Sequence, residues 1–208
     1  MSINSYDELK TAVANWTDRD DLASRIPEFI ILGEHYINRM LRTRPMERRV
    51  QASTVSGTSY YGLPPRYRQM RHMKLLTSPT TDLEYVTPER LDTMYAGSTS
   101  GKPRVYTVIG DEIRLAPTPD GAYTMEMLYY QAFEALSDSN TSNWLMEEAQ
   151  DLLLSATLSE LGPFIRDEKA VMYWTQKRDA IIVQLTTEDS RDRHSGSALS
   201  IRTEYGSP

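Results

Sequence analysis

The chain contains no cysteine and only three phenylalanines among its 208 residues. The absence of cysteine excludes disulfides, thiolate metal ligands and thiol chemistry, and it favours an intracellular or particle-bound setting over a secreted one. No apolar run approaches the roughly 20 residues that a membrane-spanning helix needs, and the first residues lack a charged and then apolar signal. We therefore expect a soluble protein without redox chemistry.

No arrangement of residues typical of catalysis, a metal site or a nucleotide cofactor is found. The three histidines fall in separate segments, and neither a phosphate-binding loop nor a dinucleotide-binding glycine pattern occurs. Glu147 and Asp151 are four residues apart, but without a histidine partner they are better explained as an acidic, solvated helix turn. The sequence predicts a protein with no catalytic residue, no metal and no cofactor.

Positive charge is scarce over most of the chain. The net charge is −6, yet between Arg39 and Lys74 nine basic residues accompany the single acid Glu47, so this segment carries +8 and the remainder −14. The nine are Arg39, Arg42, Arg44, Arg48, Arg49, Arg66, Arg68, Arg71 and Lys74. One interpretation is a basic face that meets an acidic face of a neighbouring subunit or partner, which the acidic remainder favours. The alternative is a patch that binds nucleic acid by neutralising phosphates.

Apolar periodicity predicts two helices at the start of the chain. Ser5 and Glu8 form a capping box that opens a helix over about residues 5–17. After Asp20, apolar residues from Leu22 to Leu41 recur at spacings of three and four and predict a longer helix, in which Pro27 either produces a kink or marks a new start.

A second pair of helices is predicted near the end of the chain. Asn143 is expected to cap the first of them, which ends at Gly162-Pro163. Asp167 is expected to open the next helix, which extends to Leu185.

The middle of the chain has the two-residue period of strands. A hairpin is predicted around Ser78-Pro79, and Thr87-Pro88 has the sequence of a capped helix start. Residues 101–130 predict three consecutive strands joined by turns at Gly110-Asp111 and at residues 117–121, which would form a β-meander.

The predicted fold class is α+β, because helices at both ends of the chain need partners for their apolar faces and the β section separates them. The specific prediction is a four-helix bundle with an inserted antiparallel β-rich section and an extended C-terminal arm. Residues 1–45 and 137–188 supply the helical pairs, residues 46–136 the β-rich section and residues 189–208 the flexible arm.

The arm has little apolar content, so it cannot bury enough surface to order by itself. Leu199, Ile201 and Tyr205 interrupt this polarity. Two interpretations remain: a frayed terminus, or an arm that orders on a partner with these three side chains as anchors.

Three groups of residues carry a family resemblance: Glu34–Arg42, the turn-marked strands of residues 101–119, and Asn143-Trp144-Leu145. Their order resembles that of the head-to-tail adaptor proteins of tailed bacteriophages, the connector or gatekeeper type called tail tubular protein A in some short-tailed phages. The resemblance covers most of residues 5–185. It implies a ring, usually of twelve copies, that lies between the capsid portal and the tail nozzle and lines the channel through which DNA leaves.

The resemblance also implies partners and a location. The partners are the phage portal protein, the tail nozzle protein and other copies of the chain, while DNA passes without specific binding. The location is the neck of the virion, and the host cytoplasm during assembly. The implied portal-docking residues are Leu199, Ile201 and Tyr205, and the expected subunit or partner interface contains Arg48, Arg49, Arg66 and Arg68.

Overall fold

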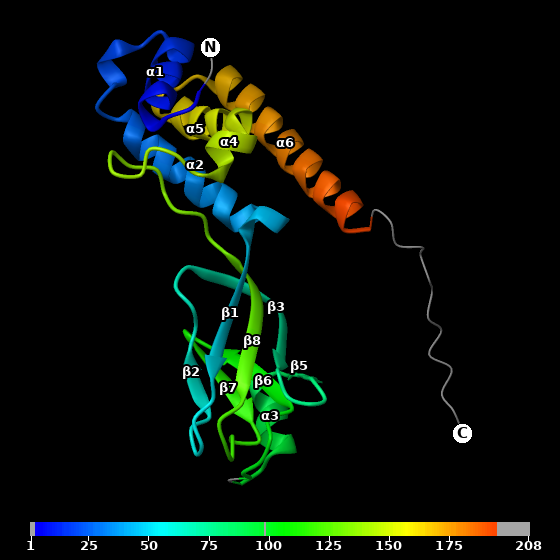
Figure 1. The fold of residues 1–208 in the computed structure, drawn as a ribbon. Coiled ribbons are helices and arrows are strands. Elements are labelled where there is room, and N and C mark those ends of the chain that lie inside the picture. Colours follow the sequence, from blue (N-terminus) through cyan, green and yellow to red (C-terminus); the bar gives the residue numbers. More distant parts are fainter. Residues whose placement is uncertain (1–2, 98, 195–208) are drawn as a thin grey trace. The chain divides into compact units, whose positions relative to one another are not determined.

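The computed structural model describes residues 3–97 and 99–194. The chain divides into two compact units, which we call the helical unit (Met1–Arg44 with Ala135–Pro208) and the β unit (Pro45–Glu134) (Figure 1). Six α-helices and two mainly antiparallel sheets confirm the α+β class. No helix among the described residues is long and apolar enough to cross a lipid bilayer.

The helical unit is built around one central helix. Its helices are α1 (Tyr6–Thr17), α2 (Ile26–Met40), α4 (Trp144–Glu148), α5 (Gln150–Ile165) and α6 (Glu168–His194), with a 3₁₀ turn η1 at Asp20–Leu22. The central helix α5 packs against α1, α2, α4 and α6. Every residue from Leu152 to Ser159 is buried, which is expected of a helix that is covered on all sides.

The starts of the first two helices follow local signals. The Ser5 hydroxyl accepts a hydrogen bond from the Glu8 backbone N–H, as the capping box predicts. Pro27 lies in the first turn of α2, where its missing N–H costs nothing. Of the two predicted possibilities, the proline therefore marks a new start of the helix and does not kink it.

The last two helices differ from their predicted bounds. The predicted third helix is interrupted at Ala149, and α5 continues through Gly162-Pro163 to Ile165, so the predicted end is wrong. Gly162 lies so close to Val171 of α6 that a β-carbon there would be 2.7 Å from a Val171 methyl, and this packing holds the last turn of α5 in place. Helix α6 extends to His194, past the predicted Leu185.

The β unit contains two four-stranded sheets. Sheet A has the order β1 (Glu47–Ser53), β8 (Thr124–Gln131), β3 (Tyr67–Leu75), β4 (Thr81–Asp82). Sheet B has the order β2 (Tyr60–Gly62), β7 (Glu112–Ala116), β6 (Val105–Ile109), β5 (Glu84–Tyr85). The pair β5 and β6 is parallel, and the other neighbours are antiparallel. A 3₁₀ turn η2 (Arg44–Met46) precedes β1, and α3 (Pro88–Met94) is capped by Thr87 as predicted.

The predicted β-meander is wrong in its third strand. Strands β6 and β7 form the expected hairpin, and β3 and β4 form the one predicted around Ser78-Pro79. Strand β8, however, leaves β7 and pairs with β1 and β3 in sheet A. Met125 and Met127 of β8 share one buried core with Ile113 and Leu115 of β7. The two strands belong to different sheets, so side chains from both sheets fill this core.

Gly33 provides a test of the close approach of α2 to α5. A β-carbon at this position would lie 3.0 Å from the Thr157 backbone nitrogen and 3.1 Å from the Ala156 carbonyl carbon, and backbone atoms cannot move aside as a flexible side chain does. We expect Gly33→Ala to lower the free energy of unfolding by about 1–3 kcal/mol. All three tryptophans, Trp16, Trp144 and Trp174, lie in the helical unit, so urea unfolding followed by tryptophan fluorescence measures this change.

The matched control is Gly62→Ala in β2, where a β-carbon would have no atom within 4 Å, with unfolding of this variant followed by circular dichroism because the β unit contains no tryptophan. That variant should unfold within about 0.5 kcal/mol of the wild type. Equal stability of the two variants would contradict a tight contact between α2 and α5.

Candidate assembly surfaces

The four arginines predicted as an interface are exposed and lie at one end of sheet A. Arg48 and Arg49 are near the start of β1, and Arg66 and Arg68 are near the start of β3. Both strands run antiparallel to β8, so their first residues lie beside its last ones, with Glu47 opposite Tyr130 and Tyr67 opposite Gln131. The structure therefore brings together residues that are about 20 positions apart in the sequence.

The same four arginines do not share one face. Successive side chains of a strand point to opposite faces, so Arg48 projects on the side of Val50, which packs against the core, and Arg49 on the outer side. The Arg48 guanidinium donates to the carbonyls of Pro45 and Glu47. Arg68 forms no ion pair within the described residues, and it lies where the β3–β8 register shifts.

Most of the basic segment is neutralised within the chain. At least five of the nine basic residues form ion pairs with acids among the described residues, namely Arg44, Arg49, Arg66, Arg71 and Lys74. Their partners include Glu126 in β8 and Asp189 in α6, which are far away in the sequence. The charge of +8 counted along the sequence is therefore not a single basic patch on the surface.

Glu126 is the centre of a polar network on the outer face of sheet A. Its carboxylate accepts hydrogen bonds from Gln51 at 2.8 Å and from Lys74 at 3.0 Å, and Arg49 lies 3.8 Å away. The hydrogen bonds from Gln51 and Lys74, together with the charge of Arg49, lower the pKa of Glu126 below its ordinary value. Glu126 thus connects β1, β8 and β3 on this face, and its single negative charge is shared by two cations.

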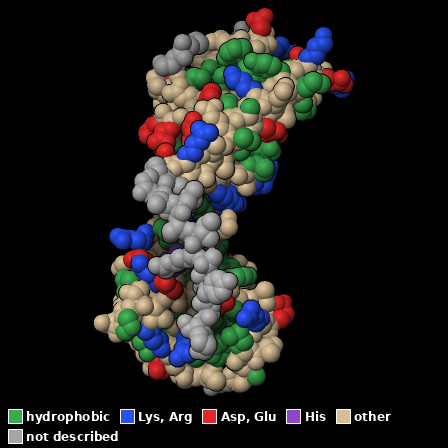
Figure 2. All heavy atoms as spheres, turned by 90° about the vertical axis from the view of Figure 1, so that its right-hand side faces the viewer, with side chains coloured by type: hydrophobic (Ala, Val, Ile, Leu, Met, Phe, Trp, Pro, Cys, Tyr) green, Lys and Arg blue, Asp and Glu red, His purple; other side chains and the backbone are tan. Residues whose placement is uncertain are grey.

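Large hydrophobic side chains are exposed on the helical unit. On α6, Met172, Tyr173 and Val183 are exposed, and Trp16 of α1 is 61% exposed although its ring contacts that of Trp174. Figure 2 shows hydrophobic side chains in several groups between charged ones on the side of this unit where α6 runs. Exposed tryptophan, tyrosine and methionine are enriched at protein interfaces.

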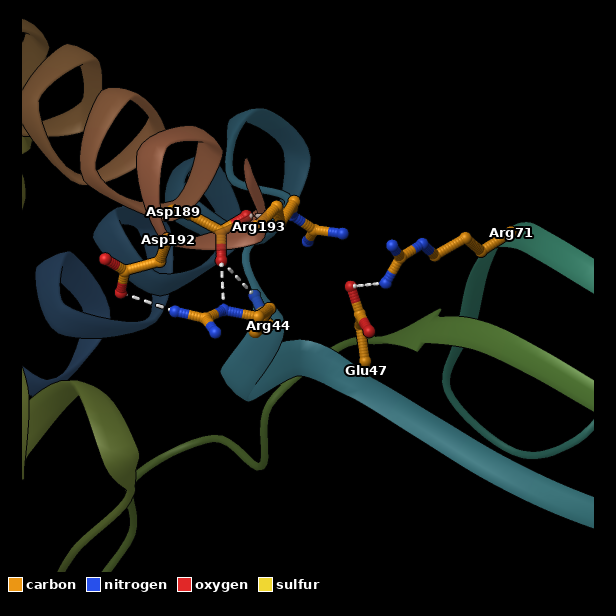
Figure 3. A network of polar contacts seen from close by, with 6 residues as sticks. All are labelled: Arg44, Glu47, Arg71, Asp189, Asp192 and Arg193. Atoms are coloured by element: carbon orange, nitrogen blue, oxygen red, sulfur yellow. Dashed lines mark hydrogen bonds and ion pairs between the residues drawn. The ribbon is translucent and has the colours of Figure 1, made fainter. Parts of the chain in front are cut away.

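Asp189 attaches the last turns of α6 to the end of the first helical segment (Figure 3). It is 8% exposed and accepts hydrogen bonds from the Arg44 backbone N–H at 2.9 Å and from the Arg193 guanidinium. Burial raises the pKa of Asp189, but these hydrogen bonds and the charge of Arg193 outweigh it, so the pKa lies below its ordinary value. Arg44 also pairs with Asp192. Figure 3 shows a separate pair in the β unit, Glu47 with Arg71.

Glu34 attaches the segment before α4 to α2. Its side chain is fully buried and accepts hydrogen bonds from the Leu136 backbone N–H at 3.0 Å and from the Asn143 side-chain amide at 3.2 Å. Asn143 at the same time caps α4, as predicted. Burial raises the pKa of Glu34 to about 7, although the two hydrogen bonds oppose this change.

The predicted docking residues Leu199, Ile201 and Tyr205 lie outside the described residues. Within the described ranges, no cluster of three or more histidine, aspartate and glutamate side chains is arranged to hold a metal ion.

Two of the residues that fix these surfaces were missed from the sequence. Glu34 falls between Ile30 and Ile37 on the apolar stripe of α2, and a carboxyl group at such a position is a signal of a buried, hydrogen-bonded acid. Asp189 gives no comparable signal, because it lies among charged residues of both signs.

The family model described as SU10 adaptor protein matches residues 4–202. The chain belongs to the SU10 adaptor protein family. It is therefore a structural adaptor-type protein of bacteriophages, and the expectation of a phage adaptor is confirmed at this level. Such adaptors are not a class of enzymes, and they act through contacts with other head and tail proteins. No curated protein matches the sequence at a significant level.

Asp189→Ala tests the attachment of α6. Removing the buried carboxylate of Asp189 leaves the Arg44 N–H and the Arg193 guanidinium without this acceptor, so we expect a loss of about 2 kcal/mol in the free energy of unfolding, measured by tryptophan fluorescence. Amide hydrogen exchange at residues 186–193 should become faster.

The control for this substitution is Asp192→Ala. It is also an aspartate-to-alanine change on α6, but the Asp192 carboxylate, which pairs with Arg44, is exposed. Its cost should stay below about 1 kcal/mol, as for other surface ion pairs. If both substitutions cost the same, the burial of Asp189 has no special role.

Glu34 makes the stability of the helical unit depend on pH. Because its pKa of about 7 in the folded state exceeds the ordinary value of 4.5, the folded state binds the proton more tightly than the unfolded state does. The stabilising contribution is complete below about pH 4.5 and is lost as the pH rises through 7. Relative to Glu34→Gln, the wild type should lose on the order of 3 kcal/mol between pH 4.5 and 8.

Urea unfolding of both proteins at a series of pH values measures this difference. Glu28→Gln, at an exposed position of the same helix, should run parallel to the wild type. If the free energies of unfolding of Glu34→Gln and the wild type changed with pH in the same way, Glu34 would not titrate in this range.

Proposed function

We propose that the protein forms a ring that joins the capsid portal to the tail nozzle and lines the channel through which the phage DNA leaves. Its proposed type is the head-to-tail connector of the gatekeeper or tail tubular kind, with the twelve copies that the resemblance implies. The observation that carries the proposal is the family match over residues 4–202. A ring is the economical architecture here, because a head-to-tail contact repeated by rotation closes on itself.

The exposed surfaces support contacts between copies. In this proposal the helical unit forms a four-helix bundle of α1, α2, α5 and α6, and the exposed side chains of α6 face a neighbour. The end of sheet A with Arg48, Arg49, Arg66 and Arg68 meets an acidic surface of the next copy or of a partner, since the rest of the chain carries −14. An acidic surface along the channel would repel DNA phosphates and let the genome pass without binding.

The C-terminal residues dock on the portal in this proposal. Helix α6 is fixed at its last turns by Arg44 and Asp189, and the residues after His194 start from this defined point. Leu199, Ile201 and Tyr205 would then insert into portal pockets, with the ordering of the arm coupled to binding.

Mass photometry of the purified chain with the portal protein of the same phage tests this function. We expect little association of the chain alone and a portal-dependent ring in the mixture. A triple variant with Leu199, Ile201 and Tyr205 replaced by alanine should form at least about tenfold less ring, since anchor residues dominate binding energy. Absence of any complex with the portal would contradict the adaptor function.

A second arm of the experiment addresses the nucleic-acid alternative. Replacing Arg48, Arg49, Arg66 and Arg68 by glutamine should weaken ring formation and leave DNA binding at its low level. Tight, salt-dependent DNA binding by the wild type that disappears in this variant would instead support a nucleic-acid-binding protein.

A further inference from the structure

A cavity of about 640 Å³ opens on the β unit beside the loop that leads into β6. Its lining includes Thr81 and Asp82 of β4, Tyr95 after α3, and two cations of the loop, Lys102 and Arg104. The assembly surfaces described above do not include this cavity.

Lys102 is held in position by uncharged partners. Its ammonium donates to the hydroxyl of Thr77 at 2.7 Å and to that of Thr81 at 2.6 Å. Thr77 donates its own hydrogen to the Pro79 carbonyl, so its oxygen is oriented to accept from Lys102. An ammonium has three donors, and these two hydroxyls occupy two of them. The third donor and the full charge remain for a ligand.

Lys102 is a half-buried cation without an acid partner, whereas Arg48, Arg68 and Arg90, which also lack one among the described residues, are exposed. Arg49, Arg66, Arg71, Lys74 and Arg114 each pair with a carboxylate. Neither Lys102 nor Arg104 has an acid within 4.0 Å among the described residues. Burying a cation without a counter-charge costs free energy, which a partner with a negative charge would recover. Because Lys102 is already held in position, binding such a partner costs little further side-chain entropy.

Asp82 does not neutralise Lys102, although it lines the same cavity. It follows Thr81 in β4, and successive side chains of a strand lie on opposite faces. Its carboxylate lies 3.2 Å from the His72 imidazole, on the outer face of sheet A. The lining therefore presents two cations, Lys102 and Arg104, and Asp82 is engaged with His72, so an anionic group such as a carboxylate suits this cavity.

We propose that this cavity binds a carboxylate side chain from a second copy of the chain, through charge-assisted hydrogen bonds from Lys102 and Arg104. The charge of −14 outside residues 39–74 supplies many candidate acids on each copy. The inference rests on the proposed ring, because it describes a contact between neighbouring copies. It adds a second cationic contact to the one assigned to the end of sheet A.

A zero-length carbodiimide crosslink tests the contact directly, since this reagent joins an amine only to a carboxylate that touches it. Rings are assembled on the portal from equal amounts of ¹⁵N-labelled and unlabelled chain, crosslinked and digested for mass spectrometry. We expect Lys102 to be joined to an aspartate or glutamate peptide of the other isotopic form. Lys74 and Glu126, which lie 3.0 Å apart within one chain, provide a positive control that stays within one form.

Substitution provides an independent measurement. Lys102→Gln removes the charge, keeps a hydrogen-bonding group, and should raise the concentration needed for half-assembly by about tenfold. Arg90→Gln is the control, because Arg90 is exposed on α3 and has no ion pair within the described residues. Circular dichroism establishes that both variants are folded.

The outcomes separate this inference from the proposed function. If rings form and Lys74 is joined to Glu126, but Lys102 is joined to no other copy or Lys102→Gln assembles normally, the inference is overturned and the ring remains. If Lys102 is joined to a portal or nozzle peptide, the occupant is a different protein and a second copy is excluded. If no ring forms at all, both the inference and the proposed function fail.

Discussion

The burial of α5 on all sides is the constraint on which the helical unit depends. Eight consecutive residues from Leu152 to Ser159 have no access to solvent beyond a few per cent, and the polar ones bond within the helix, as Thr157 does to the Leu153 carbonyl. A helix without a polar face needs neighbours around its whole circumference, and α1, α2, α4 and α6 provide them. Each of these four helices needs only one apolar face to cover its side of α5. The outer faces of α2 and α6 therefore remain exposed, with large hydrophobic side chains such as Leu32, Met172 and Val183.

Carboxyl groups determine where the segments around this core are held. Glu34 holds the segment before α4, and Asp189 holds the last turns of α6. The pKa values of the two acids are shifted in opposite directions because their surroundings differ: Asp189 has two arginines beside it, whereas Glu34 accepts hydrogen bonds from the neutral donors Leu136 and Asn143. The attachment at Asp189 therefore persists over the neutral pH range in which the attachment at Glu34 changes its protonation.

Local signals in the sequence were sufficient for most helices and for the order of the elements. Ser5, Thr87 and Asn143 cap helices as predicted, because a cap involves only residues three positions apart. The failures concern distant partners. Strand β8 shows the ordinary alternation of apolar and polar residues. Its own residues do not indicate that it pairs with β1 and β3, as found, and not with β7, as predicted. The end of α6 depends on a hydrogen bond to Arg44, 145 positions away. The candidate surfaces show the same limit, since counting charges located Arg48, Arg49, Arg66 and Arg68 but did not show that most of their basic neighbours are paired.

The β unit begins and ends on two strands that are hydrogen-bonded to each other. Glu47 at the start of β1 is the register partner of Tyr130 near the end of β8, so the two ends of this insertion lie side by side. Because the two ends of the β unit already lie together in its folded state, inserting it between the two segments of the helical unit costs little chain entropy. The β unit is thus a removable module: a different domain with adjacent ends fits between residues 44 and 135 without a change in the length of the flanking chain. Exchange of this module would leave the core of the helical unit around α5 unchanged.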